Sequence, residues 1–126
     1  MKAVLKKKVL VVDDEVFLAR VLRDRLALEG FAVERAADGE EGLDKAFSIR
    51  PDIILLDLVM PKMDGITMLK KLRDDPRGKE VPVIVLSNLN NAQLIDQSLA
   101  GGAQEFLVKV NNSLDDVVRI VKKRLG

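Results

Sequence analysis

The sequence predicts a single α/β domain in which helices cover both faces of a parallel β-sheet. Short apolar runs rich in Val, Ile and Leu, with no polar alternation, are typical of strands buried on both faces. The segments between them carry apolar residues at helical spacing. Because predicted strand and predicted helix alternate five times, each strand reaches the next by a crossover, which gives a parallel sheet. The 126 residues suffice for one such domain.

Five apolar runs are predicted as strands. Pro82 stands directly before the fourth run, where a missing N–H is tolerated. In chain order the runs are Val9–Val12, Phe31–Val33, Ile53–Leu56, Val83–Leu86 and Phe106–Val108.

Five helices are predicted from apolar stripes, and Gly or Pro follows each of the first four. The stripes are Leu18, Val21, Leu22 and Leu26; Leu43, Ala46 and Phe47; Ile66, Leu69 and Leu72; Ala92, Ile95 and Leu99; and Leu114, Val117, Val118, Val121 and Leu125.

The amino-acid composition excludes several classes of function. The formal net charge of +1 gives no indication of a nucleic-acid or membrane surface. With no Cys and no His, thiolate and imidazole chemistry is excluded, so any metal is held by oxygen, which favours Mg²⁺. The first apolar run is too short for a signal-peptide core, so a cytoplasmic protein is expected. The fifth helix reaches the C-terminus, and no output domain is expected.

Polar residues follow four of the five predicted strands. Asp13 and Asp14 end the first, Asp57 the third, Ser87 the fourth and Lys109 the fifth. Ligands of open α/β sheets bind at this carboxyl edge. Each acid alone is commonly a helix or turn cap. Together, three carboxylates at one edge would repel one another unless a cation such as Mg²⁺ offset them.

Four segments resemble the receiver domain of two-component response regulators, and the stand-alone chemotaxis-type regulators are most similar in length. The segments are Val11–Glu15, Leu56–Gly65, Leu86–Ser87 and Phe106–Lys109. The resemblance implies one receiver domain over residues 1–126. It also implies a flavodoxin-like, doubly wound five-stranded parallel sheet in the order 2-1-3-4-5, with five helices.

The resemblance also implies a role for each acid. Asp57 would be the nucleophile that takes a phosphoryl group from the phosphohistidine of a histidine kinase or phosphotransfer protein. Asp14 would bind Mg²⁺ directly and Asp13 largely through water, while Asp57 and the backbone carbonyl of Val59 would supply further ligands.

The remaining site residues are expected to act on the phosphoryl group and the signal. Ser87 would donate its hydroxyl to the phosphoryl group, and Lys109 would pair with another of its oxygens. Phe106 would be the switch aromatic that turns inward as Ser87 moves, although a plain core role is also open. The fourth helix, fifth strand and fifth helix would then present a changed face to a downstream effector, to which the chain binds as a monomer or a phosphorylation-dependent dimer.

The chain departs from the family pattern at three positions. Val110 stands where Pro is typical, so the preceding peptide bond is expected to be trans. Asn88 replaces a small residue, and Phe106 replaces the commoner Tyr. Val59 and Leu89, both apolar, are expected to keep an attacking water from the phosphoryl group and to prolong its lifetime.

Three other functions compete with this one. A haloacid dehalogenase-type phosphatase requires a second acid two residues after the nucleophile, where this chain has Val59. A dinucleotide enzyme requires glycines in the first turn, which here begins Asp13-Asp14. A degenerate receiver that only binds proteins is the remaining alternative. It would be expected to lack one or more of the acids or Lys109, all of which are present.

Overall fold

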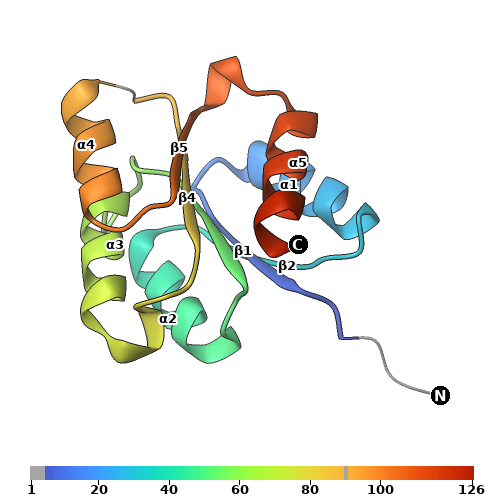
Figure 1. Ribbon diagram of the computed structural model, residues 1–126, viewed down its shortest axis with the longest axis horizontal. Helices are drawn as coiled ribbons and strands as arrows, with labels where there is room; N and C mark the ends of the chain where they lie inside the picture. The colour runs from blue at the N-terminus through green and yellow to red at the C-terminus, as the bar shows by residue number, and fades with distance from the viewer. Residues whose placement is uncertain (1–4, 90) are drawn as a thin grey trace.

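The computed structural model describes residues 5–89 and 91–126, so Met1–Val4 and Asn90 lie outside the described residues. Helices and strands alternate along the chain (Figure 1). The strands are β1 Lys8–Val12, β2 Ala32–Ala36, β3 Ile53–Leu56, β4 Val83–Ser87 and β5 Glu105–Val108. The helices are α1 Val16–Leu28, α2 Gly39–Ile49, α3 Gly65–Asp74, α4 Ala92–Ala100 and α5 Leu114–Leu125, and the 3₁₀ turns are η1 Pro76–Gly78 and η2 Lys109–Asn111.

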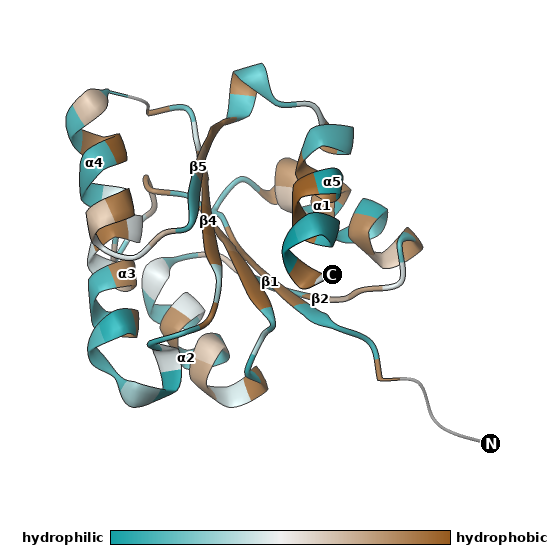
Figure 2. Ribbon diagram, in the orientation of Figure 1, coloured by the Kyte–Doolittle hydropathy of each residue, from teal (hydrophilic) through white to brown (hydrophobic). Residues whose placement is uncertain are grey.

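The five strands form one parallel sheet in the order β2-β1-β3-β4-β5, which confirms the predicted order. Helices α2, α3 and α4 cover one face, and α1 and α5 cover the other (Figure 1). Alternate residues of β1, β3 and β4 point to opposite faces, so Leu10 and Ile54 enter the core under α2 and α3, whereas Val9 and Ile53 enter the core under α1 and α5. Figure 2 shows the apolar strands between these two helical layers.

Two sequence predictions need correction. The second strand runs over Ala32–Ala36 rather than Phe31–Val33. It lies at the edge of the sheet, and its residues alternate in exposure, so Glu34 can belong to the strand while its side chain meets solvent.

The apolar stripe predicted for the fourth helix is also wrong. In α4, Leu99 is 45% exposed and Ala92 is exposed, whereas Ser98 is fully buried and Leu94 packs against the core. Ser98 tolerates burial because its hydroxyl donates to the carbonyl of Leu94, 2.8 Å away, and so has a partner.

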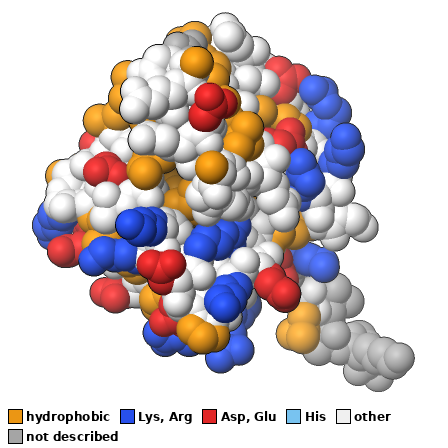
Figure 3. Space-filling view, turned by 60° about the vertical axis from the view of Figure 1, so that its left-hand side comes forward, with side chains coloured by type: hydrophobic (Ala, Val, Ile, Leu, Met, Phe, Trp, Pro, Cys, Tyr) orange, Lys and Arg blue, Asp and Glu red, His pale blue; other side chains and the backbone are white. Residues whose placement is uncertain are grey.

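The side of the molecule that carries α3 and α4 combines apolar and charged areas. Figure 3 shows hydrophobic side chains in the upper part of the view, while many of the Lys and Arg side chains lie lower down. A cleft on this side is lined by residues of the β3–α3 loop, of α3 and of α4, among them Met60, Ile66 and Leu94. No helix within residues 5–89 and 91–126 has the length and apolar character needed to cross a membrane.

Candidate functional site

Three aspartates meet at the carboxyl edge of the sheet, at the ends of β1 and β3. Asp13 and Asp57 are buried, and Asp14 is exposed. One carboxylate oxygen from each of the three lies within 4.8 Å of the others. The backbone N–H of Asp57 donates to the carbonyl of Val12, which extends the β1–β3 pairing to the phosphoacceptor candidate itself. The two central strands therefore fix the relative positions of these carboxylates.

Lys109 places its ammonium against this cluster from the end of β5. Its Nζ lies 2.9 Å from Oδ2 of Asp13 and 3.4 Å from Oδ2 of Asp57. The Lys109 side chain is only 9% exposed, so both ion pairs are shielded from solvent. The buried cation therefore offsets part of the negative charge of the two buried acids.

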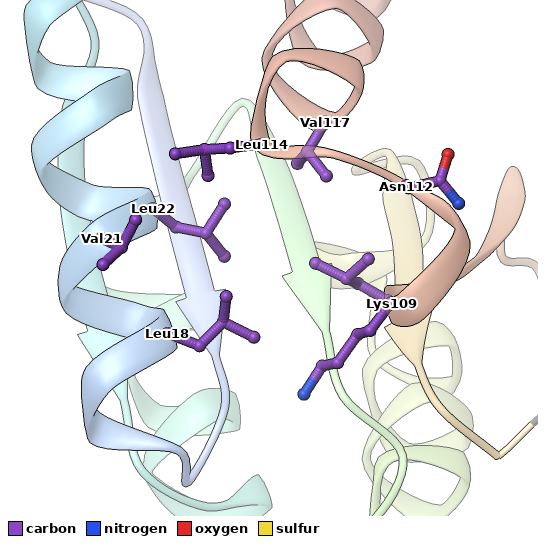
Figure 4. Close-up of a pocket in the computed structure, with 8 residues that line it drawn as sticks. Leu18, Val21, Leu22, Lys109, Asn112, Leu114 and Val117 are labelled. Atoms are coloured by element: carbon purple, nitrogen blue, oxygen red, sulfur yellow. The ribbon is translucent and has the colours of Figure 1, made fainter.

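The stem of Lys109 borders an apolar cavity of about 150 Å³ between α1 and α5. Figure 4 shows the side chain extending from the end of β5 past Leu18 of α1, with its nitrogen at the far end. Leu114 and Val117 of α5 complete the apolar surroundings. Methylene groups can follow such a wall while the charged end meets polar partners, so α1 and α5 guide the ammonium to the acids.

Burial and neighbouring charges shift the pKa values of Asp57 and Lys109. Burial, followed by the negative charge of Asp13, raises the pKa of Asp57, and the nearby ammonium of Lys109 opposes this. Burial of Lys109 is the largest single effect and opposes its charge, but the contacts with Asp13, Asp57 and Glu15 together outweigh burial and raise the pKa of the ammonium. Lys109 thus offsets only part of the cost of ionising Asp57, and a further cation would stabilise the Asp57 carboxylate.

The donor set fits Mg²⁺. Carboxylates are hard oxygen ligands, and the cluster includes one solvent-facing acid, Asp14, beside two buried ones. Asp13 also accepts a hydrogen bond from the backbone N–H of Glu15 at 2.9 Å, which orients its carboxylate. Val59 lines the same open cleft as Asp14 and Asp57, in the loop that follows β3.

Ser87 and Phe106 lie where the strand pattern predicts. Ser87 ends β4, is almost fully buried and lines the cleft with Asp57 and Lys109. Its hydroxyl oxygen accepts from the N–H of Leu89, at 3.2 Å. Phe106 is half-buried in β5 and packs against the core on the α4 side. The structure thus brings Ser87 to the acids and places Phe106 in β5 beside Val85 of β4, two residues before Ser87, while their roles stay predictions.

The Asp-Gly pair that ends the Met-Pro-Lys-Met-Asp-Gly segment has a structural explanation at the start of α3. Asp64 caps α3, because its side chain accepts from the N–H of Thr67 at 2.8 Å. Gly65 follows at the first helical position and donates its N–H to the carbonyl of Leu58 at 2.9 Å. A side chain at position 65 would meet the backbone of Asp57 and Leu58, so glycine permits the close packing of this loop.

Two polar side chains, Glu15 and Arg35, make contacts at the site that the sequence analysis does not predict. Glu15 also accepts from Lys109, at 3.2 Å, and its place directly after the acid pair was an available signal. The guanidinium of Arg35 donates to the carbonyl of Asp13 at 3.0 and 3.2 Å. No sequence pattern shows this second contact, because it depends on β2 lying beside β1. The peptide bond between Lys109 and Val110 is trans, as predicted.

Comparisons with known proteins agree with this geometry. The family model described as the response regulator receiver domain matches residues 9–122. The chain is 40% identical over 117 residues to the response regulator PleD of Caulobacter vibrioides, a match that covers 93% of this chain and 25% of PleD. It is 37% identical over 105 residues to the chemotaxis protein CheY of Treponema pallidum, covering 81% of this chain and 72% of that protein. The chain thus spans about a quarter of PleD but most of CheY.

Solved structures show the same fold. Chemotaxis protein CheY4 of Vibrio cholerae superposes with a TM-score of 0.88 at 31% identity, covering 96% of this chain and all of that one. A chain of the CheX-CheY-BeF3-Mg+2 complex from Borrelia burgdorferi gives a TM-score of 0.85 at 37% identity, covering 95% of this chain and 90% of that one. Receiver domains typically bind Mg²⁺ in an acidic pocket, take part in phosphoryl transfer and interact with histidine kinases and effectors. With its sheet order, its acidic pocket and this match over residues 9–122, the chain belongs to the response-regulator receiver domain family.

Proposed function

We propose that the chain accepts a phosphoryl group on Asp57 from the phosphohistidine of a histidine kinase or phosphotransfer protein. One observation carries the proposal. The Lys109 ammonium lies 2.9 Å from Asp13 and 3.4 Å from Asp57, inside a cluster of three carboxylates that opens to solvent through Asp14. A purely structural ion pair would need neither the third carboxylate nor the cleft beside it.

Asp57 is prepared to act as the nucleophile. Its Oδ1 accepts from the N–H of Leu58 at 2.8 Å, and its Oδ2 faces the ammonium of Lys109, so the carboxylate is held in one orientation. In the transfer, a carboxylate oxygen forms a bond to phosphorus while the bond from phosphorus to the histidine nitrogen breaks. The electron pair of that bond stays on the imidazole.

The other site residues act on the charge that arrives. Asp13, Asp14 and Asp57, with the carbonyl of Val59, would hold Mg²⁺, which supplies charge neutralisation for the phosphoryl oxygens when bound. Lys109 would exchange one of its carboxylate contacts for a phosphoryl oxygen, and Ser87 would donate its hydroxyl to another. Both groups already line the cleft beside Asp57.

The same contacts would switch the α4–β5–α5 face for a downstream effector. Ser87 and Lys109 interact more favourably with a phosphoryl group than with the bare carboxylate, and this difference shifts a pre-existing equilibrium. Support comes from α4, where Ser98 is the buried residue among those described. Leu94 of α4 is only partly buried against the core, so moving the helix disrupts little apolar packing, and the half-buried ring of Phe106 lies in the adjacent strand.

Incubation with acetyl phosphate and Mg²⁺ tests the proposal. We expect one acid-stable, base-labile phosphoryl group per chain, detected by mass spectrometry, with no incorporation after Asp57→Asn or in the presence of EDTA. Asp44→Asn, which changes an exposed aspartate of α2, is the matched control and should be phosphorylated like the wild type. An inert wild type would leave the binding-only receiver as the better description.

A further inference from the structure

A hydrogen bond joins the two loops that carry Ser87 and Lys109. The side-chain oxygen Oδ1 of Asn88 accepts from the backbone N–H of Val110 at 3.1 Å. Asn88 directly follows β4, and Val110 directly follows Lys109 in the turn η2. The contact therefore connects residues next to Ser87 and Lys109, across two neighbouring strands.

The donor at Val110 is available because of its place in η2. The first N–H groups of a helical turn have no partner within the turn. Val110 is the second residue of Lys109–Asn111, and its N–H has the Asn88 oxygen as its partner in the described part of the chain. A proline at position 110 would have no N–H to donate. Asn88 thus supplies an acceptor, and a non-proline residue at position 110 supplies the N–H that this acceptor needs.

A second asparagine forms a hydrogen bond on the other side of the same turn. Nδ2 of Asn112 donates to the carbonyl of Val108 at 3.0 Å. The turn that carries Lys109 is therefore held on both sides by amide side chains, although Val110 itself is 78% exposed and has little packing to fix it. The 2.9 Å contact between Lys109 and Asp13 depends on the position of this turn.

We propose that Asn88 is a positioning residue, which fixes the Lys109 turn through the N–H of Val110 and makes that turn follow the loop after Ser87. The inference rests on the proposed function, because it assigns to Asn88 a share in presenting Lys109 to the phosphoryl group. It goes beyond that function in coupling the two phosphoryl-binding loops to each other before any ligand binds.

Amide hydrogen exchange of the metal-free, unphosphorylated protein tests the contact itself. In Asn88→Ala the Val110 amide is expected to exchange about three- to tenfold faster than in the wild type, because it loses its acceptor. Asn88→Asp keeps a carboxylate oxygen as acceptor and should retain the protection. Asn111→Ala is the matched control, since Asn111 is an exposed asparagine of the same turn with no side-chain hydrogen bond to residues 5–89 or 91–126. Unchanged exchange at Val110 in Asn88→Ala overturns the proposal.

Phosphorylation by acetyl phosphate in Mg²⁺ tests the consequence for Lys109. Asn88→Ala should lower the initial rate about three- to tenfold in the wild-type background. In the Val110→Pro background the same substitution should change the rate by less than about twofold, because the donor is already gone. A steric or general folding effect of Asn88 would appear equally in both backgrounds and would refute the coupling, as would a wild-type rate in Asn88→Ala. If no variant incorporates phosphate, wild type included, the proposed function fails while the exchange result still decides whether the contact exists.

Discussion

Gly65→Ala is expected to destabilise the fold and at the same time to displace Asp57, the proposed phosphoacceptor. A Cβ atom built on Gly65 lies 2.8 Å from Cα of Leu58 and still closer to the carbonyl oxygen of Asp57. Both neighbours are backbone atoms at the end of β3, so no side-chain rotation can relieve the contact. Either the start of α3 or the segment carrying Asp57 must move.

The size of the effect follows from this overlap. Inserting a methyl group against well-packed backbone costs about 1–3 kcal/mol. An unfolding entropy of about 2.1 cal/mol/K per residue gives roughly 0.26 kcal/mol/K for 126 residues, so the melting temperature should fall by about 4–11 °C. Displacement of Asp57 should also slow phosphorylation by acetyl phosphate about tenfold to a hundredfold.

Gly42→Ala supplies the matched control for this experiment. Gly42 is also a buried helical glycine, but the atoms nearest its Cβ would belong to side chains, Sδ of Met68 at 2.9 Å and Cγ1 of Val12 at 3.0 Å, rather than to the backbone. Alanine is favoured over glycine inside a helix by up to about 1 kcal/mol, which offsets the adjustment. Thermal unfolding followed by circular dichroism measures both variants. A Gly65→Ala protein that melts within about 2 °C of the wild type, or no lower than Gly42→Ala, would refute the argument.

Three further outcomes are expected. Asp14→Ala should weaken Mg²⁺ binding, measured by calorimetry, about tenfold or more, and Ser87→Ala less than about twofold; equal affinities would contradict the metal assignment. Val59→Asn with Leu89→Glu should speed loss of the phosphoryl group about tenfold, or ~1.4 kcal/mol of barrier, after donor removal, since both apolar side chains line the cleft; an equal or slower rate counts against it. Ser113→Ala should cost about 1 kcal/mol in urea unfolding by removing the capping box of α5, and an unchanged midpoint would show that the cap is dispensable.

The sequence predicts the central strands well because their environment is uniform. Strands β1, β3 and β4 are buried on both faces, so apart from Lys8 and Ser87 at their ends every position carries an apolar residue, and the run is visible without knowledge of its partners. The edge strand β2 and helix α4 were predicted less accurately. In both, exposed and buried positions are decided by neighbouring elements, and a serine with an internal hydrogen bond can occupy a core position that apolar patterning assigns to Leu99.

The site was predictable to the extent that it lies at strand ends. Asp13, Asp57 and Lys109 follow β1, β3 and β5 directly, and a parallel sheet brings these ends to one edge. The contacts made by Arg35 and Asn88 were not predictable, because each joins loops whose distance is set only by the folded sheet. Long-range hydrogen bonds between single polar side chains and backbone groups leave no periodic signal.

The shallow attachment of α4 has a consequence for how such proteins diversify. A helix with one fully buried side chain, that of Ser98, and with Leu94 only partly buried against the core places few demands on its exposed positions. With α4 in the proposed effector face, substitutions on its outer surface can alter partner choice with little effect on folding stability, so recognition and architecture can evolve almost independently. The exposed positions of α4, which are free to vary in this way, are Ala92, Gln93, Asp96, Gln97, Leu99 and Ala100.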